Sequence, residues 1–146
     1  MIKNSEVIRE VLTTMIDISS RKTTEGHAIL VMDSLIKKLE ERYDFLKHIE
    51  IKDTRFLEMD EPITVMSDID VVKSNYVGEA LYDIITTMNK TLGKEAGHFF
   101  IKELKNSIRE EYYSTIKDMG LDLSLMQLEF EISELEKRLI NTRRTD

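Results

Sequence analysis

The sequence predicts a mostly helical protein of class α or α+β, with about five helices and one small antiparallel β-hairpin near the middle of the chain. Along most of its 146 residues, apolar residues recur every three or four positions, which is the period of an amphipathic helix. Near residue 48 the period changes to two, as in a half-buried strand. With one proline and five glycines, the chain has few residues that would interrupt these helices.

The first two helices are expected to form an antiparallel hairpin over residues 1–47. The first begins at Asn4 or Ser5, both of which are common helix-capping residues, and apolar pairs then repeat every four positions. A second apolar stripe runs from Ile29 to Leu46 at steps of three and four. It predicts one helix of about six turns.

A β-hairpin is expected over residues 48–69. Ile49 and Ile51 alternate with polar residues, and so do Ile63 and Val65 after a turn signal. A two-stranded ribbon is only marginally stable alone, so we expect one of its faces to pack on the helices.

Three further helices are expected over residues 70–142. The first begins at Asp70 or Ser74 and ends at Gly93, a residue type that favours the left-handed conformation of a helix end. Neither a linker nor a change in composition interrupts the chain, so we expect a single domain over 1–146.

The second of these helices is expected to run unbroken from Ala96 to Met119, because its apolar residues recur at helical spacing throughout. It should end at Gly120. The apolar Leu121 follows directly, and a glycine followed by an apolar residue is typical of a Schellman cap.

The last helix carries the most regular apolar pattern in the chain. Five apolar residues alternate steps of three and four, as in the seam of a coiled coil: Leu125, Leu128, Ile132, Leu135 and Leu139. Such a narrow stripe buries best against a copy of itself or one neighbouring helix. We therefore expect a homodimer that forms through this helix.

A second candidate contact site lies at the start of the predicted fourth helix. Glu95 and His98 would share one helix face and could bind a metal together, but two ligands leave a metal site incomplete, so we expect no metal and no cofactor. A glycine such as Gly97 costs about 1 kcal/mol relative to alanine inside a helix. Its presence therefore indicates that another helix or a ligand approaches the backbone closely at this position.

Phe99 and Phe100 are adjacent on this helix and cannot both face the same core. We expect them either to fill the core or to line an apolar pocket.

Composition excludes several classes of function. The 28 acidic residues outnumber the 21 basic ones, and the net charge of -7 would repel a nucleic-acid backbone. Without cysteine there are no disulfides, thiolate metal ligands or cysteine nucleophiles. The common phosphate-binding and zinc-protease motifs are absent. The chain has no long apolar run and no signal peptide, so we expect a soluble cytoplasmic protein without a membrane partner.

The sequence therefore favours a non-catalytic regulatory or protein-interaction module that acts as a homo-oligomer. Its partner is expected to be a second copy of the chain. An unknown protein and a small ligand are the alternative partners. The alternative function is a small-ligand sensor or small enzyme, with a pocket between the third and fourth helices.

Overall fold

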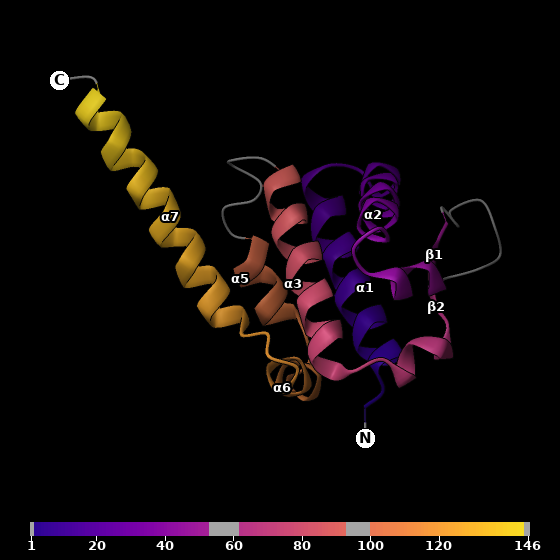
Figure 1. Ribbon diagram of the computed structural model, residues 1–146. Helices are drawn as coiled ribbons and strands as arrows, with labels where there is room; N and C mark the ends of the chain where they lie inside the picture. Colours follow the sequence, from indigo (N-terminus) through magenta and orange to yellow (C-terminus); the bar gives the residue numbers. More distant parts are fainter. Residues whose placement is uncertain (1, 53–61, 93–99, 145–146) are drawn as a thin grey trace.

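The computed structural model of the protein describes residues 2–52, 62–92 and 100–144. Within these ranges it contains six α-helices and a two-stranded antiparallel sheet (Figure 1). The predicted class, mostly helical with a small central hairpin, is confirmed. None of the helices in these ranges is long and apolar enough to cross a membrane.

The central element of the body is helix α1 (Asn4–Lys22), which begins at Asn4 as the sequence predicts. Its apolar side is buried, and it contacts α2, α3, α5, α6 and the hairpin. Helix α2 (Glu25–Leu39) follows after a short turn, and the side chain of Thr24 caps it by accepting a hydrogen bond from the backbone N–H of His27 at 3.1 Å. One hydrophobic core therefore surrounds α1.

The prediction that the second helix continues to Leu46 is wrong. Helix α2 ends at Leu39, and a 3-10 helix, η1 (Asp44–His48), follows after a turn. Tyr43, Phe45 and Leu46 are all buried. In a continuous helix Tyr43 and Leu46 would share a face, but Phe45 would point about 100° or more away from both. Burying all three therefore favours the tighter, redirected backbone.

The predicted hairpin is present. Strands β1 (Ile49–Ile51) and β2 (Ile63–Val65) pair antiparallel, with Ile49 opposite Val65 and Ile51 opposite Ile63. β2 packs on α1 and β1 on α2, so the hairpin is stabilised by the helices as a short ribbon requires.

Asp70 has a different role from the one expected. Helix α3 (Ser74–Thr91) begins at Ser74, whereas Asp70 lies before it in the 3-10 helix η2 (Ser67–Val71). The carboxylate Oδ1 of Asp70 accepts a hydrogen bond from the backbone N–H of Ser5 at 2.9 Å. Asp70 therefore caps the start of α1 rather than that of α3, and its negative charge favours the positive end of the α1 dipole.

The cap predicts how stability depends on pH. The hydrogen bond from the Ser5 backbone lowers the pKa of Asp70 below its usual value of 3.8. A carboxyl group with a lowered folded-state pKa stabilises the fold fully above its unfolded-state pKa, and this contribution is lost as pH falls through the folded-state pKa.

We expect Asp70→Ala to lower the free energy of unfolding by about 1 kcal/mol at pH 7, as loss of a helix cap does. Urea denaturation at pH 7 and at pH 3 measures the free energy of unfolding of the variant and of the wild type. The difference between the two proteins should be smaller at pH 3. Asp70→Asn retains an acceptor oxygen and should be less destabilising than Asp70→Ala at pH 7. An equal loss at both pH values would contradict a role for the charge.

The fourth predicted helix is interrupted, which corrects the expectation of one unbroken element. The described part forms α5 (Phe100–Ser107) and α6 (Glu110–Asp118). Between them Arg109 is extended, with φ -62° and ψ 145°, and Ile108 is buried. The break allows α6 to lie beside α1, where the Arg109 guanidinium is 3.7 Å from the Glu10 carboxylate.

The predicted Schellman cap closes α6. Gly120 has a positive φ of 95°, and its N–H donates to the carbonyl of Lys117 at 3.0 Å. The N–H of Leu121 donates to the carbonyl of Ile116 at 3.1 Å. The chain then turns into the last helix, α7 (Leu123–Arg144).

Candidate functional site

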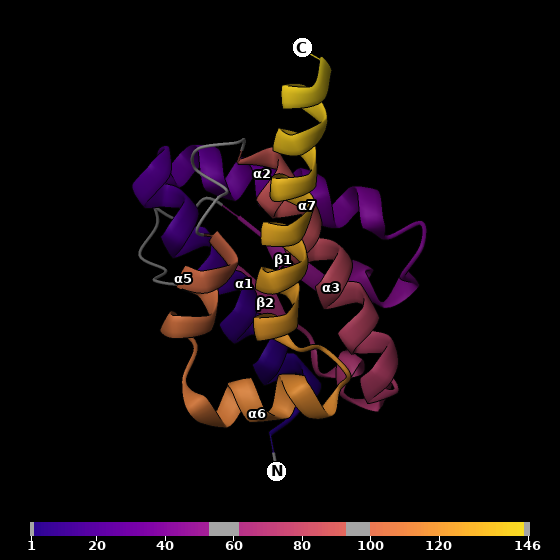
Figure 2. The same ribbon diagram turned by 90° about the vertical axis from the view of Figure 1, so that its left-hand side faces the viewer.

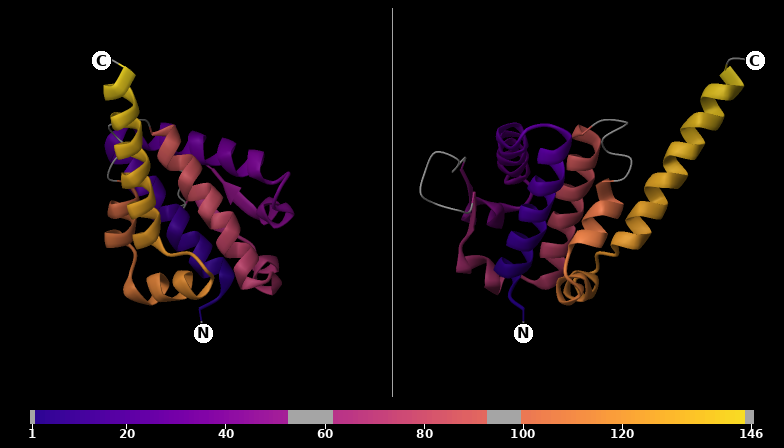
Figure 3. Two further views of the ribbon diagram at one scale, coloured as in Figure 1. Left: turned by 60° about the vertical axis from the view of Figure 1, so that its left-hand side comes forward. Right: turned by 180° about the vertical axis from the view of Figure 1, so that it is seen from behind.

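Helix α7 leaves the body after its first turns and extends beyond it (Figures 1 and 3). Leu123 and Met126 are buried at its base, Phe130 is partly buried one turn further on, and α5 packs beside these turns. In Figure 2, α7 lies in front of the body, with α5 on its left and α3 crossing behind it. The face of α7 that carries Leu123, Met126 and Phe130 is therefore the face that packs on the protein.

The regular apolar pattern of α7 lies on the opposite face. The five residues of this α7 stripe retain between 47% and 56% of their maximal exposure: Leu125, Leu128, Ile132, Leu135 and Leu139. At 100° per residue, the centre of the stripe is about 180° from the centre of the face that packs on the body. The stripe therefore does not pack on its own chain within the described residues.

Exposed apolar side chains are concentrated on this helix. Of the eleven large apolar or aromatic residues that are exposed in the described ranges, six belong to α7, namely the five residues of the α7 stripe and Ile140. The others are spread over the rest of the body. Contiguous apolar surface of this kind is typical of an interaction site, whereas scattered single residues are not.

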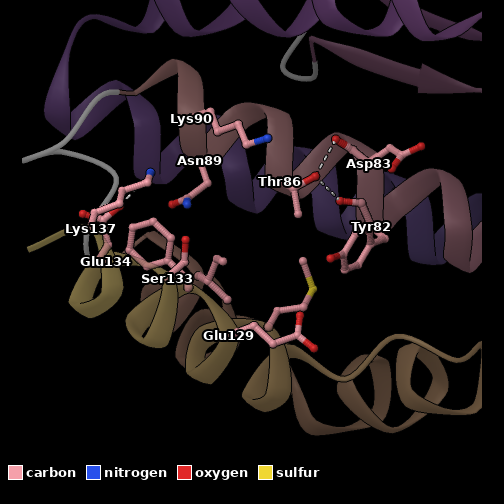
Figure 4. A pocket seen from close by; sticks show the side chains of 12 residues that line it. Tyr82, Asp83, Thr86, Asn89, Lys90, Glu129, Ser133, Glu134 and Lys137 are labelled. Atoms are coloured by element: carbon pink, nitrogen blue, oxygen red, sulfur yellow. Dashed lines mark hydrogen bonds and ion pairs between the residues drawn. The ribbon is translucent and has the colours of Figure 1, made fainter. Parts of the chain in front are cut away.

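A groove separates α7 from α3, with α5 at its floor (Figure 4). Its volume is about 780 Å³. Apolar parts of Ile101, Met126 and Phe130 line it together with polar groups from both helices, including Asn89 and Ser133. The dimensions and mixed lining would suit a small amphipathic molecule.

Asn89 is the most unusual residue of the groove. It is 5% exposed, and its Oδ1 atom has no hydrogen-bond partner among the described residues. Nearby, the hydroxyl of Thr86 donates to the carbonyl of Tyr82 in the same helix at 2.9 Å, so its hydrogen does not bond to the Asn89 oxygen. A buried amide oxygen without a donor is costly, and a ligand that donates a hydrogen bond would relieve that cost.

A second hollow of about 520 Å³ lies between α3, the segment after α2 and the end of α6. There the Tyr43 hydroxyl donates to Asp83 Oδ2 at 2.6 Å, and Arg42 lies 3.1 Å from the same carboxylate oxygen. Burial and the bond to Asp83 raise the pKa of Tyr43 to about 12. A phenol that is this reluctant to ionise is a poor base or nucleophile, and the cluster serves to join the two segments.

Gly78 lies at the same hollow, where α3 crosses the end of α6. A Cβ atom at this position would overlap the carbonyl oxygen of Met119. Sequence reasoning singled out Gly97 as the glycine of close approach and missed Gly78, because the partner of Gly78 is 41 positions away in the chain.

Most of the contact site expected near residue 97 lies outside the described residues, namely Glu95, Gly97, His98 and Phe99. Phe100 is described: it is completely buried in the core at the first turn of α5. It is not among the residues that line either hollow. In the part of the chain that the structure describes, no three histidine or acidic side chains lie close enough together to bind a metal ion.

Comparisons with protein-family models, with curated proteins and with solved structures found no match to this chain.

Proposed function

We propose that the protein is a non-catalytic interaction module that associates with a second copy of itself through the α7 stripe. The observation that supports this most directly is that five apolar residues at coiled-coil spacing stand exposed on the face of α7 that points away from the body. In a lone chain this surface would remain in water.

The energetics favour a weak and reversible interaction. Covering the remaining exposed half of a leucine or isoleucine contributes roughly 1 kcal/mol, so eight to ten such side chains from two copies contribute roughly 8–10 kcal/mol. Association itself costs roughly 4–15 kcal/mol in lost freedom of motion. With a cost near the low end of that range the surplus is roughly 4–6 kcal/mol, so we expect a dissociation constant of roughly 40–1,000 µM, as for other small interfaces.

Sedimentation equilibrium tests the proposal over a concentration range that spans these values. The wild type should move from the mass of one chain toward twice that mass. Ile132→Glu or Leu135→Glu places a charge in the stripe and should leave a monomer. Both positions are about half exposed, so the variants should keep the wild-type melting temperature at low concentration.

Leu30→Glu is the matched control, because Leu30 is an exposed leucine on α2, away from the stripe. This variant should associate as the wild type does. A wild type that stays monomeric at millimolar concentration, or association that survives both stripe substitutions, would overturn the proposal.

A small-ligand sensor is the second candidate function. The groove between α3 and α7 favours it, because the amide oxygen of Asn89 has no hydrogen-bond partner in the part of the chain that the structure describes. Native mass spectrometry of the purified protein separates the two functions. A ligand would add a constant mass to the wild type that Asn89→Leu loses. The stripe variant Leu135→Glu should retain that mass, because its side chain lies on the opposite face of α7.

A further inference from the structure

We infer that the two α7 helices pair antiparallel, with Leu128 of one copy opposite Leu139 of the other and Ile132 opposite Leu135. This inference rests on the self-association proposed above and specifies its geometry. It follows from the charged residues that flank the α7 stripe. In a coiled coil the positions beside the apolar seam decide orientation, and here four of them are exposed and charged: Glu129, Glu131, Glu136 and Arg138.

A parallel pair brings like charges together. In heptad terms Leu125 and Ile132 occupy position a, which makes Glu131 a g residue and Glu136 an e residue. In a parallel pair each g residue faces the e residue five positions further along the second helix. Glu131 of each copy would then face Glu136 of the other, and this repulsion would occur twice.

An antiparallel pair changes these partners. A two-fold axis across the helices makes each edge face the same edge of the other copy, so that g residues meet g residues. Glu131 then lies beside Arg138 of the second copy, again twice, and both contacts attract. At the other edge Glu129 approaches Glu136 of the second copy. Attraction on one edge thus offsets repulsion on the other, whereas the parallel pair has no such offset among these four residues.

The charges also select the register. With Leu128 opposite Leu139 of the second copy, four apolar layers form and both Glu131 to Arg138 contacts are made. A shift by one heptad would place Leu125 opposite Leu135 and still form four apolar layers. In the shifted register Glu131 of each copy lies beside Glu131 of the other, so the charged positions at that edge of the seam repel each other.

The geometry leaves room for both bodies. The α7 stripe points away from its own body, and α7 spans 22 residues, which is about 33 Å. In the antiparallel pair the second body lies at the far end of this helix and on the other side of it. Both grooves between α3 and α7 stay accessible, because they lie on the faces of the two helices that are turned away from the interface.

Charge reversal tests the orientation. In the antiparallel pair, Glu131→Lys sets two lysines against Arg138 and should weaken association roughly tenfold, as should Arg138→Glu. An equimolar mixture of the two variants should recover the association of the wild type, since both contacts between positions 131 and 138 attract again and the Glu129 to Glu136 contacts are unchanged. Glu41→Lys makes the same charge change in the segment after α2 and should leave association unchanged. If Glu131→Lys tightens association, the pair is parallel and the inference is wrong.

Disulfide trapping provides a second test, because the natural chain has no cysteine. In the antiparallel pair Leu128→Cys and Leu139→Cys should each resist self-crosslinking in a glutathione buffer, since identical positions lie about 16 Å apart. A mixture of the two variants should form a crosslinked heterodimer. Self-crosslinking of each variant alone would establish a parallel pair and overturn the inference. A wild type that stays monomeric at millimolar concentration would instead overturn the proposed self-association, on which the inference rests.

Discussion

Replacing Phe100 with alanine should lower the free energy of unfolding by about 3–5 kcal/mol, the largest effect that we expect from a single side chain in this protein. Phe100 is completely buried at the start of α5 and belongs to the single core around α1. The loss combines the transfer free energy of the ring with the cost of the cavity that it leaves. For a domain of this size the melting temperature should fall by roughly 6–20 °C.

Urea denaturation measures the effect of Phe100→Ala, with Leu30→Ala as the control. Leu30 is exposed on α2, so its truncation should change the free energy of unfolding by less than about 0.5 kcal/mol. A small loss at Phe100 would mean that the ring is not a core anchor. It would then favour the interpretation of this residue as part of a ligand contact.

Gly78→Ala should lower the free energy of unfolding by about 1–3 kcal/mol, although alanine is the better helix former by about 1 kcal/mol. The added Cβ would meet the carbonyl oxygen of Met119, which is backbone and part of the end of α6. Rotation of a side chain cannot relieve that overlap. Helix α3 and the end of α6 must therefore move apart, and the core between them loosens.

Thermal denaturation of Gly78→Ala and Glu79→Ala compares neighbouring positions on α3. Glu79 is exposed, so its substitution should shift the free energy of unfolding by less than about 0.5 kcal/mol. A rise in melting temperature for Gly78→Ala would show that helix propensity outweighs the contact. The close approach of α3 to Met119 would then be wrong.

The elements that sequence reasoning predicted well depend on residues close together in the chain. The α6 cap needs only Gly120, Leu121 and the preceding turn, and all its hydrogen bonds are local. The hairpin required only the alternation of apolar and polar residues in two short segments. The spacing of the α7 stripe was equally visible, because every member lies on one helix.

The elements that were predicted wrongly depend on distant partners. The stripe from Ile29 to Leu46 has helical spacing, yet the chain leaves the helix at Leu39 and joins Tyr43 to Asp83 on α3. Asp70 looked like a cap for the helix that follows it and instead caps α1, 65 positions away. Propensity and periodicity are weak local preferences that tertiary packing overrides.

By itself, the sequence determined the helical class, the central hairpin, the local caps and a coiled-coil pattern on the last helix, since each is written in the spacing of neighbouring residues. Only the tertiary structure decided which way that pattern faces. Periodicity defines two opposite faces of α7 but does not say which one meets the body. The contacts of Leu123 and Met126 with the core assign the packed face, and they leave the α7 stripe exposed to a partner.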